Sequence, residues 1–564
     1  TPLFFSPKTS ELFVYNKMML IYGLTIVITG SWVVKSILNR EFIFKKTPLD
    51  IPIFLFLISQ VLSTFFSIDR HTSIWGYYSR SNGGLLSIIS YTLLFYAFVS
   101  NFDKFQALKF LKSAVFGGFL VSLYAIPEHF GFSPSCLLLN QTISADCWIQ
   151  DVQARVFATL GQPNWLAAYL AMLFFPVVYF FLTAENLKSK IFYYLTIIAY
   201  YLAFTFTYSR GGTLGLLGGL GVFLSFWLVQ NHRVIASGAK QSLKIPSLKP
   251  LIIAMSTILV INLLLGSALT GGFSLIPGAG PNRPVIGTGQ IKSGTQLETG
   301  GTESGTIRLI VWEGALNIFK AFPVFGSGTE TFAYSYYQYR PAKHNLVSEW
   351  DFLYNKAHNE YLNYLATTGL VGFLSYLALI LGFILFCIRY QISSIKKKVL
   401  NTNYLILNTV LLAGYISYLN QNIFSFSVVI IATLFYLFPA FAFVLTDQLK
   451  EEKIPKKLRD FSLKILNTTI YRRDSYPKIF CGFIFLICFL MLFKLVNYWN
   501  ADTLFNQGSK YSDSGNPGKA YNLLYDAVAL NKKEPLYRNE LGYAAASAAL
   551  ALEETDSTTS AQLK

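Results

Sequence analysis

Residues 357–388 read AHNEYLNYLATTGLVGFLSYLALILGFILFCI, a short polar segment that passes directly into the apolar stretch 362–388. A helix needs about 20 apolar residues to cross the hydrocarbon core of a bilayer, so this stretch predicts a transmembrane helix. Similar stretches lie at 12–38, 50–67, 84–100, 108–127, 163–182, 189–208, 211–230, 250–269, 403–424, 427–446 and 479–497. The pattern predicts an all-α, polytopic transmembrane helical bundle of about 12 spans.

Composition and charge agree with a membrane protein. The 564 residues are 53% hydrophobic and 13% charged, whereas soluble domains carry about 25% charged residues. Twenty-five Lys and Arg fall in one set of connections: 39–47, 101–112, 183–190, 231–249, 389–398 and 447–478. The opposite short connections, 68–83 and 128–160, hold only Arg70, Arg80 and Arg155. The positive-inside rule makes the basic set cytoplasmic, so the net charge of +17 reflects topology and nucleic acid is not an expected partner.

This topology predicts four regions. They are N-terminal transmembrane helices (1–269), a long extracytoplasmic loop with short amphipathic helices (270–361), C-terminal transmembrane helices (362–497) and an extracytoplasmic tail (498–564). The chain opens on Thr1 rather than Met, so we expect that one further span preceded it, which would make about thirteen.

The long loop contains two different segments. Residues 271–306 are rich in Gly, Ser and Thr, which is typical of a mobile segment and suggests a lid. Residues 307–320 place Ile307, Ile310, Leu316 and Phe319 at helical spacing and predict a short amphipathic helix. Arg308 and Trp312 are i,i+4 neighbours on that helix. Pro323, Gly326 and Gly328 then end it, and the aromatic-rich stretch that follows suits either sugar stacking or an interfacial belt.

The tail and the cysteines add two expectations. Gly508 and Gly542 lie 34 residues apart, and Tyr511, Ala520, Leu524 and Ala527 fall where a tetratricopeptide repeat places its packing residues. A truncated repeat of this kind would dock a protein or an acceptor. Cys136 and Cys147 share an outer loop, where a disulfide is chemically permitted but not required.

Four arginines lie on the face where the topology rule disfavours them. Arg80 is in YYSRSNGG (77–84), Arg155 precedes GQPNW (161–165), Arg210 is in YSRGG (208–212), and Arg308 is in the long loop. Each could extend to lipid headgroups or end a helix. As a set they suggest a diphosphate site, because guanidinium groups contact phosphate oxygens in pairs.

His358 is a candidate base beside these arginines. Its imidazole titrates near neutrality, which suits removal of a proton from an attacking hydroxyl. Glu360 either orients it or caps the following helix, and the spacing does not separate these roles. The alternative is that His358 is an ordinary surface histidine.

Several functions lack their usual signals. No Asp or Glu falls in the middle of an apolar stretch, which weakens ion-coupled transport. No metal-ligand spacing and no phosphate-binding loop for nucleotides is visible, so neither a metal nor a cofactor is expected.

Together, the motifs resemble a known family. Arg308-x3-Trp312, Pro323-x2-Gly326-x-Gly328 and His358-Asn359-Glu360-Tyr361-Leu362, with Ser209-Arg210-Gly211-Gly212 and Pro163-Asn164, are similar to the signature of the O-antigen ligase/polymerase superfamily. The resemblance covers roughly residues 1–450. Members are membrane glycosyltransferases of the GT-C type. The resemblance implies a bacterial cytoplasmic membrane protein that works on undecaprenyl-diphosphate-linked glycans at the outer face, without a metal.

The resemblance also implies residue roles. Arg210 and Arg308 would act with His358 in catalysis, and the residues expected to contact substrate are Arg80, Arg155, Asn164, Trp312, Asn359, Glu360 and Tyr361. The acceptor would be a glycan, a lipid or a protein, and the repeat-like tail keeps polymerase and protein-glycosylating activities open beside ligation. Two further readings are a polysaccharide exporter or flippase, which would work without His358, and a scaffold that presents the tail.

Overall fold

The computed structural model describes residues 1–39, 41, 43–78, 80–236, 248–269, 304–396, 402–451, 476–553, 559 and 562. The chain is all-α, as predicted; within these residues the one sheet is the antiparallel pair β1 (Lys45–Lys46) and β2 (Lys450–Glu451). Contacts divide the chain into two compact units, Leu3–Ile43 with Lys453–Lys564, and Phe44–Glu452. Residues 271–303 of the segment predicted to be a lid (271–306) lie outside the described residues.

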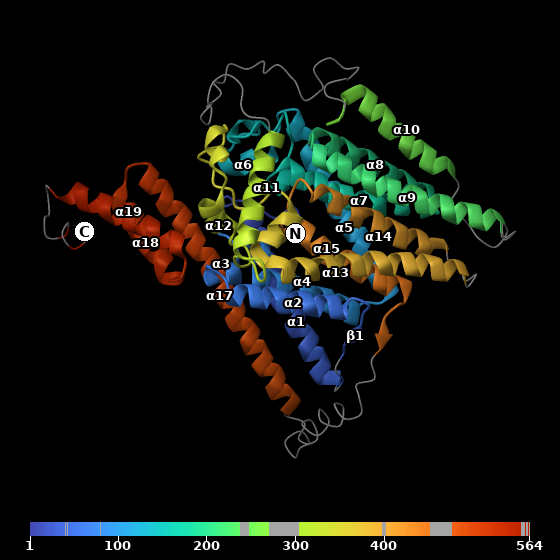
Figure 1. Cartoon of the computed structure of the whole chain (residues 1–564), viewed down its shortest axis with the longest axis horizontal. Coiled ribbons are helices and arrows are strands. Elements are labelled where there is room, and N and C mark those ends of the chain that lie inside the picture. Colours follow the sequence, from blue (N-terminus) through green and yellow to red (C-terminus); the bar gives the residue numbers. More distant parts are fainter. Residues whose placement is uncertain are drawn as a thin grey trace. The chain divides into compact units, whose positions relative to one another are not determined.

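The unit Phe44–Glu452 holds most of the helices (Figure 1). Its α-helices are α2 (Asp50–Phe65), α3 (Arg70–Trp75), α4 (Leu85–Asn101), α5 (Lys104–His129), α6 (Pro134–Asn140), α7 (Pro163–Thr183), α8 (Leu187–Phe206), α9 (Arg210–Ala236), α10 (Leu248–Leu265), α11 (Ser304–Ala321), α12 (Phe332–Tyr339), α13 (Glu360–Lys396), α14 (Thr402–Gln421) and α15 (Val429–Thr446). Short 3-10 turns are η1 (Ser81–Gly83), η2 (Ala145–Cys147), η3 (Ala158–Leu160) and η4 (Ala342–Leu346).

The twelve predicted apolar stretches all fall on helices, but not all of these helices are long and apolar enough to cross a membrane. Among the described residues, eight helices are long and apolar enough to cross a membrane: α1, α5, α7, α8, α9, α13, α15 and α17. Three others, α2, α4 and α10, are shorter apolar helices. α14 is 20 residues long but carries three Asn and one Gln. The chain is therefore a multi-pass membrane protein whose bundle also contains helices too short or too polar to count as simple spans.

The centre of the bundle is formed by α7 and α15. In each, 94% of the most apolar window is buried. Both are apolar around their whole circumference, which is the composition of a helix enclosed by other helices. α7 packs against α8, α9 and α14, and α15 packs against α4 and α14. The arrangement brings the ends of α7, α9 and α14 together, where the candidate site lies.

α13 is interrupted near its start. At Gly369 the φ angle is 63°, which breaks the helical path. Residues 323–328 run along this break, and the Leu370 amide donates a hydrogen bond of 2.8 Å to the Pro323 carbonyl. The backbone of this segment thus satisfies groups that the interrupted helix leaves open. Pro323 and Gly328, which follow α11 in the chain, therefore hydrogen-bond to the first part of α13.

We expect Gly326→Ala to lower stability strongly. Gly326 has a φ of 72°, and an added Cβ would lie 2.2 Å from the backbone carbon of Thr367. A non-glycine residue in this conformation costs about 1–3 kcal/mol before any overlap is counted. The melting temperature in detergent measures the loss. Gly221→Ala is the matched control, because nothing lies within 4 Å of its added Cβ; equal melting temperatures for the two variants would contradict the proposed contact.

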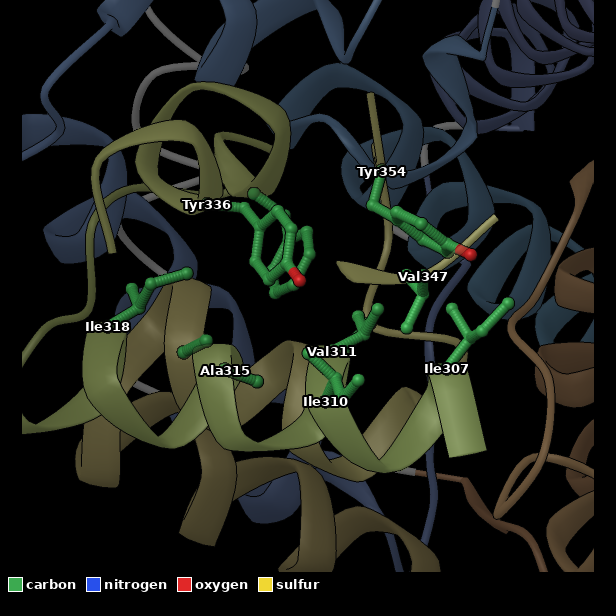
Figure 2. Close-up of a cluster of buried hydrophobic side chains, with 11 residues drawn as sticks. Ile307, Ile310, Val311, Ala315, Ile318, Tyr336, Val347 and Tyr354 are labelled. Atoms are coloured by element: carbon green, nitrogen blue, oxygen red, sulfur yellow. The ribbon is translucent and has the colours of Figure 1, made fainter. Parts of the chain in front are cut away.

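The amphipathic helix predicted over 307–320 is α11, and it packs on α12 and α13. Figure 2 shows its buried side chains directed toward Tyr336 and Tyr354. Ile307 and Ile310 are buried as predicted, but Leu316 is 41% exposed. Val311, Ala315 and Ile318 complete the buried face instead. Sequence spacing did not reveal that the aromatic loop after α11 folds back over a different side of the helix.

The second unit contains α1 (Val14–Asn39), α17 (Tyr476–Asp513), α18 (Pro517–Leu530) and α19 (Pro535–Leu552). α1 packs along α17, and α18 packs between α17 and α19. Ala501, Ala520, Leu524 and Ala527 are fully buried. An added Cβ at Gly508 would lie 2.7 Å from Leu524, so this glycine permits close approach of α17 and α18. These helices suit a helical hairpin, and the assignment to a tetratricopeptide repeat stays a prediction.

Candidate functional site

Three of the predicted arginines line one cavity of about 910 Å³. The cavity lies among the ends of α7, α9, α11 and α14. Its lining residues are Arg155, Asn164, Tyr208, Ser209, Arg210, Gly211, Leu214, Ala268, Ser304, Gly305, Arg308, Leu309, Trp312, Gln421, Phe424 and Ser425. Two further predicted residues, Asn164 and Trp312, are in this wall. We call this space the arginine cavity.

Arg210 enters the cavity from the first position of α9. The turn before it is fixed by Ser209, whose Oγ accepts from the Gly212 amide (3.1 Å) and donates to Asn164 Oδ1 (2.8 Å). The Arg210 side chain is exposed to the cavity. The N-terminus of a helix carries partial positive charge and free amides, so its position adds to the attraction for an anion.

Arg155 is held in place by two contacts. Its Nε donates to the Thr207 carbonyl (3.1 Å), and its Nη2 donates to Asn164 Oδ1 (3.2 Å). Burial, and then the charges of Arg308 and Arg210, lower the pKa of Arg155. These three guanidinium groups repel one another, and a bound anion would offset that repulsion. Asn164 therefore acts here as a support for Arg155 and Ser209.

Arg308 and Trp312 reach the cavity from successive turns of α11. Burial lowers the pKa of Arg308, and the nearby groups of Tyr354 and Glu349 partly oppose this. Within the described part of the chain, no carboxylate forms an ion pair with Arg308 or Arg210. The Trp312 side chain lines the cavity, and its Nε1 is buried without a hydrogen-bond partner in the described chain.

His358 lies beside the arginine cavity rather than in its wall. Its φ of 51° is left-handed, which is uncommon for a residue other than glycine and often marks a functional position. The imidazole sits edge-on to Tyr354 (5.5 Å) and Phe426 (5.2 Å). Burial, followed by the charges of Arg308 and Arg80, lowers the pKa of His358 to about 4. The side chain is therefore neutral at pH 7 and able to accept a proton.

Arg80 joins the site through an aromatic ring that also contacts His358. Its guanidinium lies over Trp165 at 5.2 Å and over Phe426 at 5.8 Å. Phe426 is thus shared between Arg80 and His358. The four predicted arginines divide into three that line the cavity and one that faces the histidine. Arg308 belongs to both groups, because it lines the cavity and acts electrostatically on His358.

Asn359, Glu360 and Tyr361 hold the start of α13 and do not line the arginine cavity. Asn359 Oδ1 accepts from the Leu362 amide (3.0 Å), which caps the helix. Tyr361 donates to the Leu419 carbonyl (2.9 Å). Glu360 is buried in a smaller cavity of about 30 Å³, where it accepts from the Ser427 amide (3.2 Å).

Two features of the site were not predicted from the sequence. Gln421 is 1% exposed, donates to the Asn164 carbonyl (2.5 Å) and leaves its Oε1 without a partner in the cavity wall. The run Asn420-Gln421-Asn422 at the end of an apolar stretch was a visible signal for it. The buried ion pair of Lys356 and Glu330 anchors the loop that carries His358. No sequence signal linked these two residues, because they meet only in the fold.

The candidate site contains nitrogen donors and few carboxylates. Among the described residues, no group of three or more His, Cys, Asp or Glu side chains is placed to hold a metal ion. The cavity is instead suited to an anion, since its charged lining residues are Arg155, Arg210 and Arg308.

Comparison with known proteins points to one family. Residues 194–377 match the family model described as O-antigen ligase. The matched segment includes Arg210, Arg308 and His358, whereas Arg80 and Arg155 precede it. No curated protein matches the chain. The match supports an enzyme of the O-antigen ligase/polymerase type, which acts in general on a lipid-linked glycan and an acceptor, and so supports placing this membrane protein in the O-antigen ligase superfamily.

Proposed function

We propose that this protein is a metal-independent glycosyltransferase of the bacterial cytoplasmic membrane. It would move an undecaprenyl-diphosphate-linked glycan to an acceptor hydroxyl at the outer membrane face. The observation that carries the proposal is the convergence of Arg155, Arg210 and Arg308 on one cavity, next to a neutral histidine.

The arginine cavity suits a lipid diphosphate in its charge and in its apolar lining. Three guanidinium groups and the N-terminus of α9 offer donors to the phosphate oxygens. Leu214, Leu309 and Phe424 form an apolar part of the same wall, suited to the first units of the polyprenyl chain. A free sugar nucleotide would make no use of that apolar wall.

His358 would act as the base. In the transfer step, the acceptor oxygen forms a bond to the anomeric carbon while the bond from that carbon to the diphosphate oxygen breaks. The hydroxyl proton passes to the imidazole, and undecaprenyl diphosphate leaves with the bonding electron pair. Arg308 and Arg210 would stabilise the charge that develops on the leaving oxygen, which is often the largest contribution to catalysis.

The activities within the superfamily differ in the acceptor that they use. A ligase would use a glycolipid hydroxyl, a polymerase would use a second lipid-linked glycan, and a protein-glycosylating enzyme would use a Ser or Thr side chain. The helical tail favours none of these acceptors by itself. We expect a reconstituted assay to separate them.

The test is transfer from purified undecaprenyl-diphosphate glycan by the full chain in lipid vesicles. Parallel reactions would contain lipid A-core, additional donor, or a Ser/Thr-rich peptide, each with and without a chelator. Product in one arm supports the transferase and names the acceptor class. Movement of intact donor across the bilayer without any transfer would instead support a flippase.

The pH dependence should reveal the base. Because the pKa of His358 is lowered to about 4, the free enzyme should keep its base unprotonated down to that pH. We therefore expect the acid limb of kcat/KM near pH 4. Bound diphosphate offsets the charge of Arg308, which lines the cavity, and so raises the pKa of the imidazole; the acid limb of kcat should therefore lie at higher pH. Coincident limbs for the two parameters would contradict this account.

A further inference from the structure

Residues 130–149 form an exposed apolar segment at the end of α5, outside the arginine cavity. Large apolar side chains cover it, and each is more than half exposed: Phe130, Phe132, Leu137, Leu138, Ile143 and Ile149. An apolar patch of this kind on a water-exposed surface would favour aggregation, and it usually marks a contact with lipid or protein.

The shape of this segment is fixed, so it does not bury these groups by folding on itself. Cys136 and Cys147 form a disulfide across it. The Ser133 amide donates to the Ile143 carbonyl (2.9 Å), and the Ala145 amide donates to the Gly131 carbonyl (2.9 Å). The outward direction of the apolar side chains is therefore built into the segment.

The segment lies at a boundary of the transmembrane bundle. It connects α5 and α7, two helices long and apolar enough to span a membrane. At its start, His129 stacks on Phe206 at 3.9 Å, and after its end, Arg155 bonds to the Thr207 carbonyl. Both contacts are at the same end of α8. The segment is thus at the membrane boundary next to the arginine cavity.

The exposed face of α5 continues into the segment. Phe116, Leu123 and Phe130 follow one another at intervals of seven residues and are 49%, 47% and 58% exposed. Residues at this spacing lie on nearly the same side of a helix. The face that α5 presents to lipid therefore extends without a break into the apolar segment.

We propose that residues 130–149 are an interfacial anchor that inserts into the lipid leaflet at the end of the bundle that carries the arginine cavity. Lipid fits better than a protein partner because the apolar surface is continuous with the lipid-facing side of α5. Residues 130–154 contain no Lys or Arg, so insertion depends on apolar burial at the headgroup and acyl boundary rather than on attraction to anionic lipid.

The anchor has a consequence for the site that rests on the proposed function. Arg155 follows the segment directly, and its guanidinium is held by Thr207 and Asn164. An anchor at the headgroup level would keep this arginine at the depth where the diphosphate of a lipid donor lies. Insertion itself is independent of any transfer activity.

Photo-crosslinking of the full chain in phosphatidylethanolamine/phosphatidylglycerol vesicles tests the insertion. Leu138 or Ile143 is replaced by benzoylphenylalanine, and lipid adducts are counted by mass spectrometry after irradiation. Tyr543 on α19, 64% exposed, is the control position. We expect several-fold more lipid adduct at positions 138 and 143 than at 543. Absence of that excess, or adducts mainly to a second protein chain, would overturn the proposal.

A charge placed in the patch provides a second arm. With benzoylphenylalanine at position 143, Leu138→Asp should remove most of the lipid adduct, because a carboxylate resists entry into the apolar layer. Gln141→Asp is the matched control: it adds the same charge at an exposed polar residue of the same segment. The melting temperature of each variant shows whether it folds. Equal adduct in both Asp variants also overturns the proposal, whether or not the protein transfers glycan.

Discussion

His358→Asn should lower kcat for glycan transfer by about 10²–10⁴-fold, the usual effect of removing a general base. Asparagine is a better replacement than alanine, because asparagine tolerates the left-handed backbone conformation that His358 adopts at φ 51°. The amide cannot accept the hydroxyl proton in the imidazole's place. Single-turnover rates with bound donor measure the chemical step directly.

Donor binding should change little in the same variant. His358 lies beside the arginine cavity and is not part of its wall, so the dissociation constant for the lipid diphosphate is expected to stay within about threefold of the parent. His71→Asn, on α3, makes the same replacement at a histidine outside the arginine cavity. If the His358→Asn enzyme transfers glycan as fast as the His71→Asn enzyme, His358 is not the base.

The helices and the charged residues of the site were predictable because their signals are local. Each apolar stretch carries its own tendency to form a helix, and arginine on the sparsely charged face is visible in the sequence alone. The cavity brings together Arg155, Arg210 and Arg308, three of the four arginines in the predicted set, while Arg80 lies outside its wall. Arg155 and Arg210 lie in connections at one end of neighbouring helices, whereas Arg308 reaches the cavity from α11 in the long loop.

What escaped prediction depends on contacts between distant segments. The buried face of α11 shifted from Leu316 to Val311 and Ile318 because the later loop folds over it. The break in α13 at Gly369 is supported by a segment more than forty residues earlier, at 323–328. Spacing within one helix contains no information on such partners.

The position of Glu360 illustrates the same limit at the site. Its spacing from His358 suggested either an orienting group or a helix cap, and the fold directs it into a separate buried cavity with Glu330 and Lys356. Asn359 provides the side-chain cap instead. Side-chain direction at a helix start depends on how the preceding loop enters, and here the positive φ of His358 sets that entry.

Arg308→Ala should weaken donor binding more than any other single change in the arginine cavity. Loss of a charge-assisted contact at a largely buried site costs about 2–4 kcal/mol, which corresponds to about 30–1000-fold in the dissociation constant. Arg308→Lys should recover part of this, because it keeps the charge and loses the paired donors. Titration with a labelled polyprenyl diphosphate measures all three proteins, and Arg70→Ala, an exposed arginine outside the cavity, is the control.

Arg308→Ala should also alter the histidine, and this second readout separates a specific role from simple loss of structure. The charge of Arg308 is one cause of the lowered pKa of His358. Its removal should raise that pKa, so the acid limb of kcat/KM should move to higher pH than in the parent. Arg308→Lys retains the charge and should leave the limb close to its original position. A binding loss without this movement would place Arg308 in the donor cavity alone, whereas both changes together would link diphosphate binding to the base.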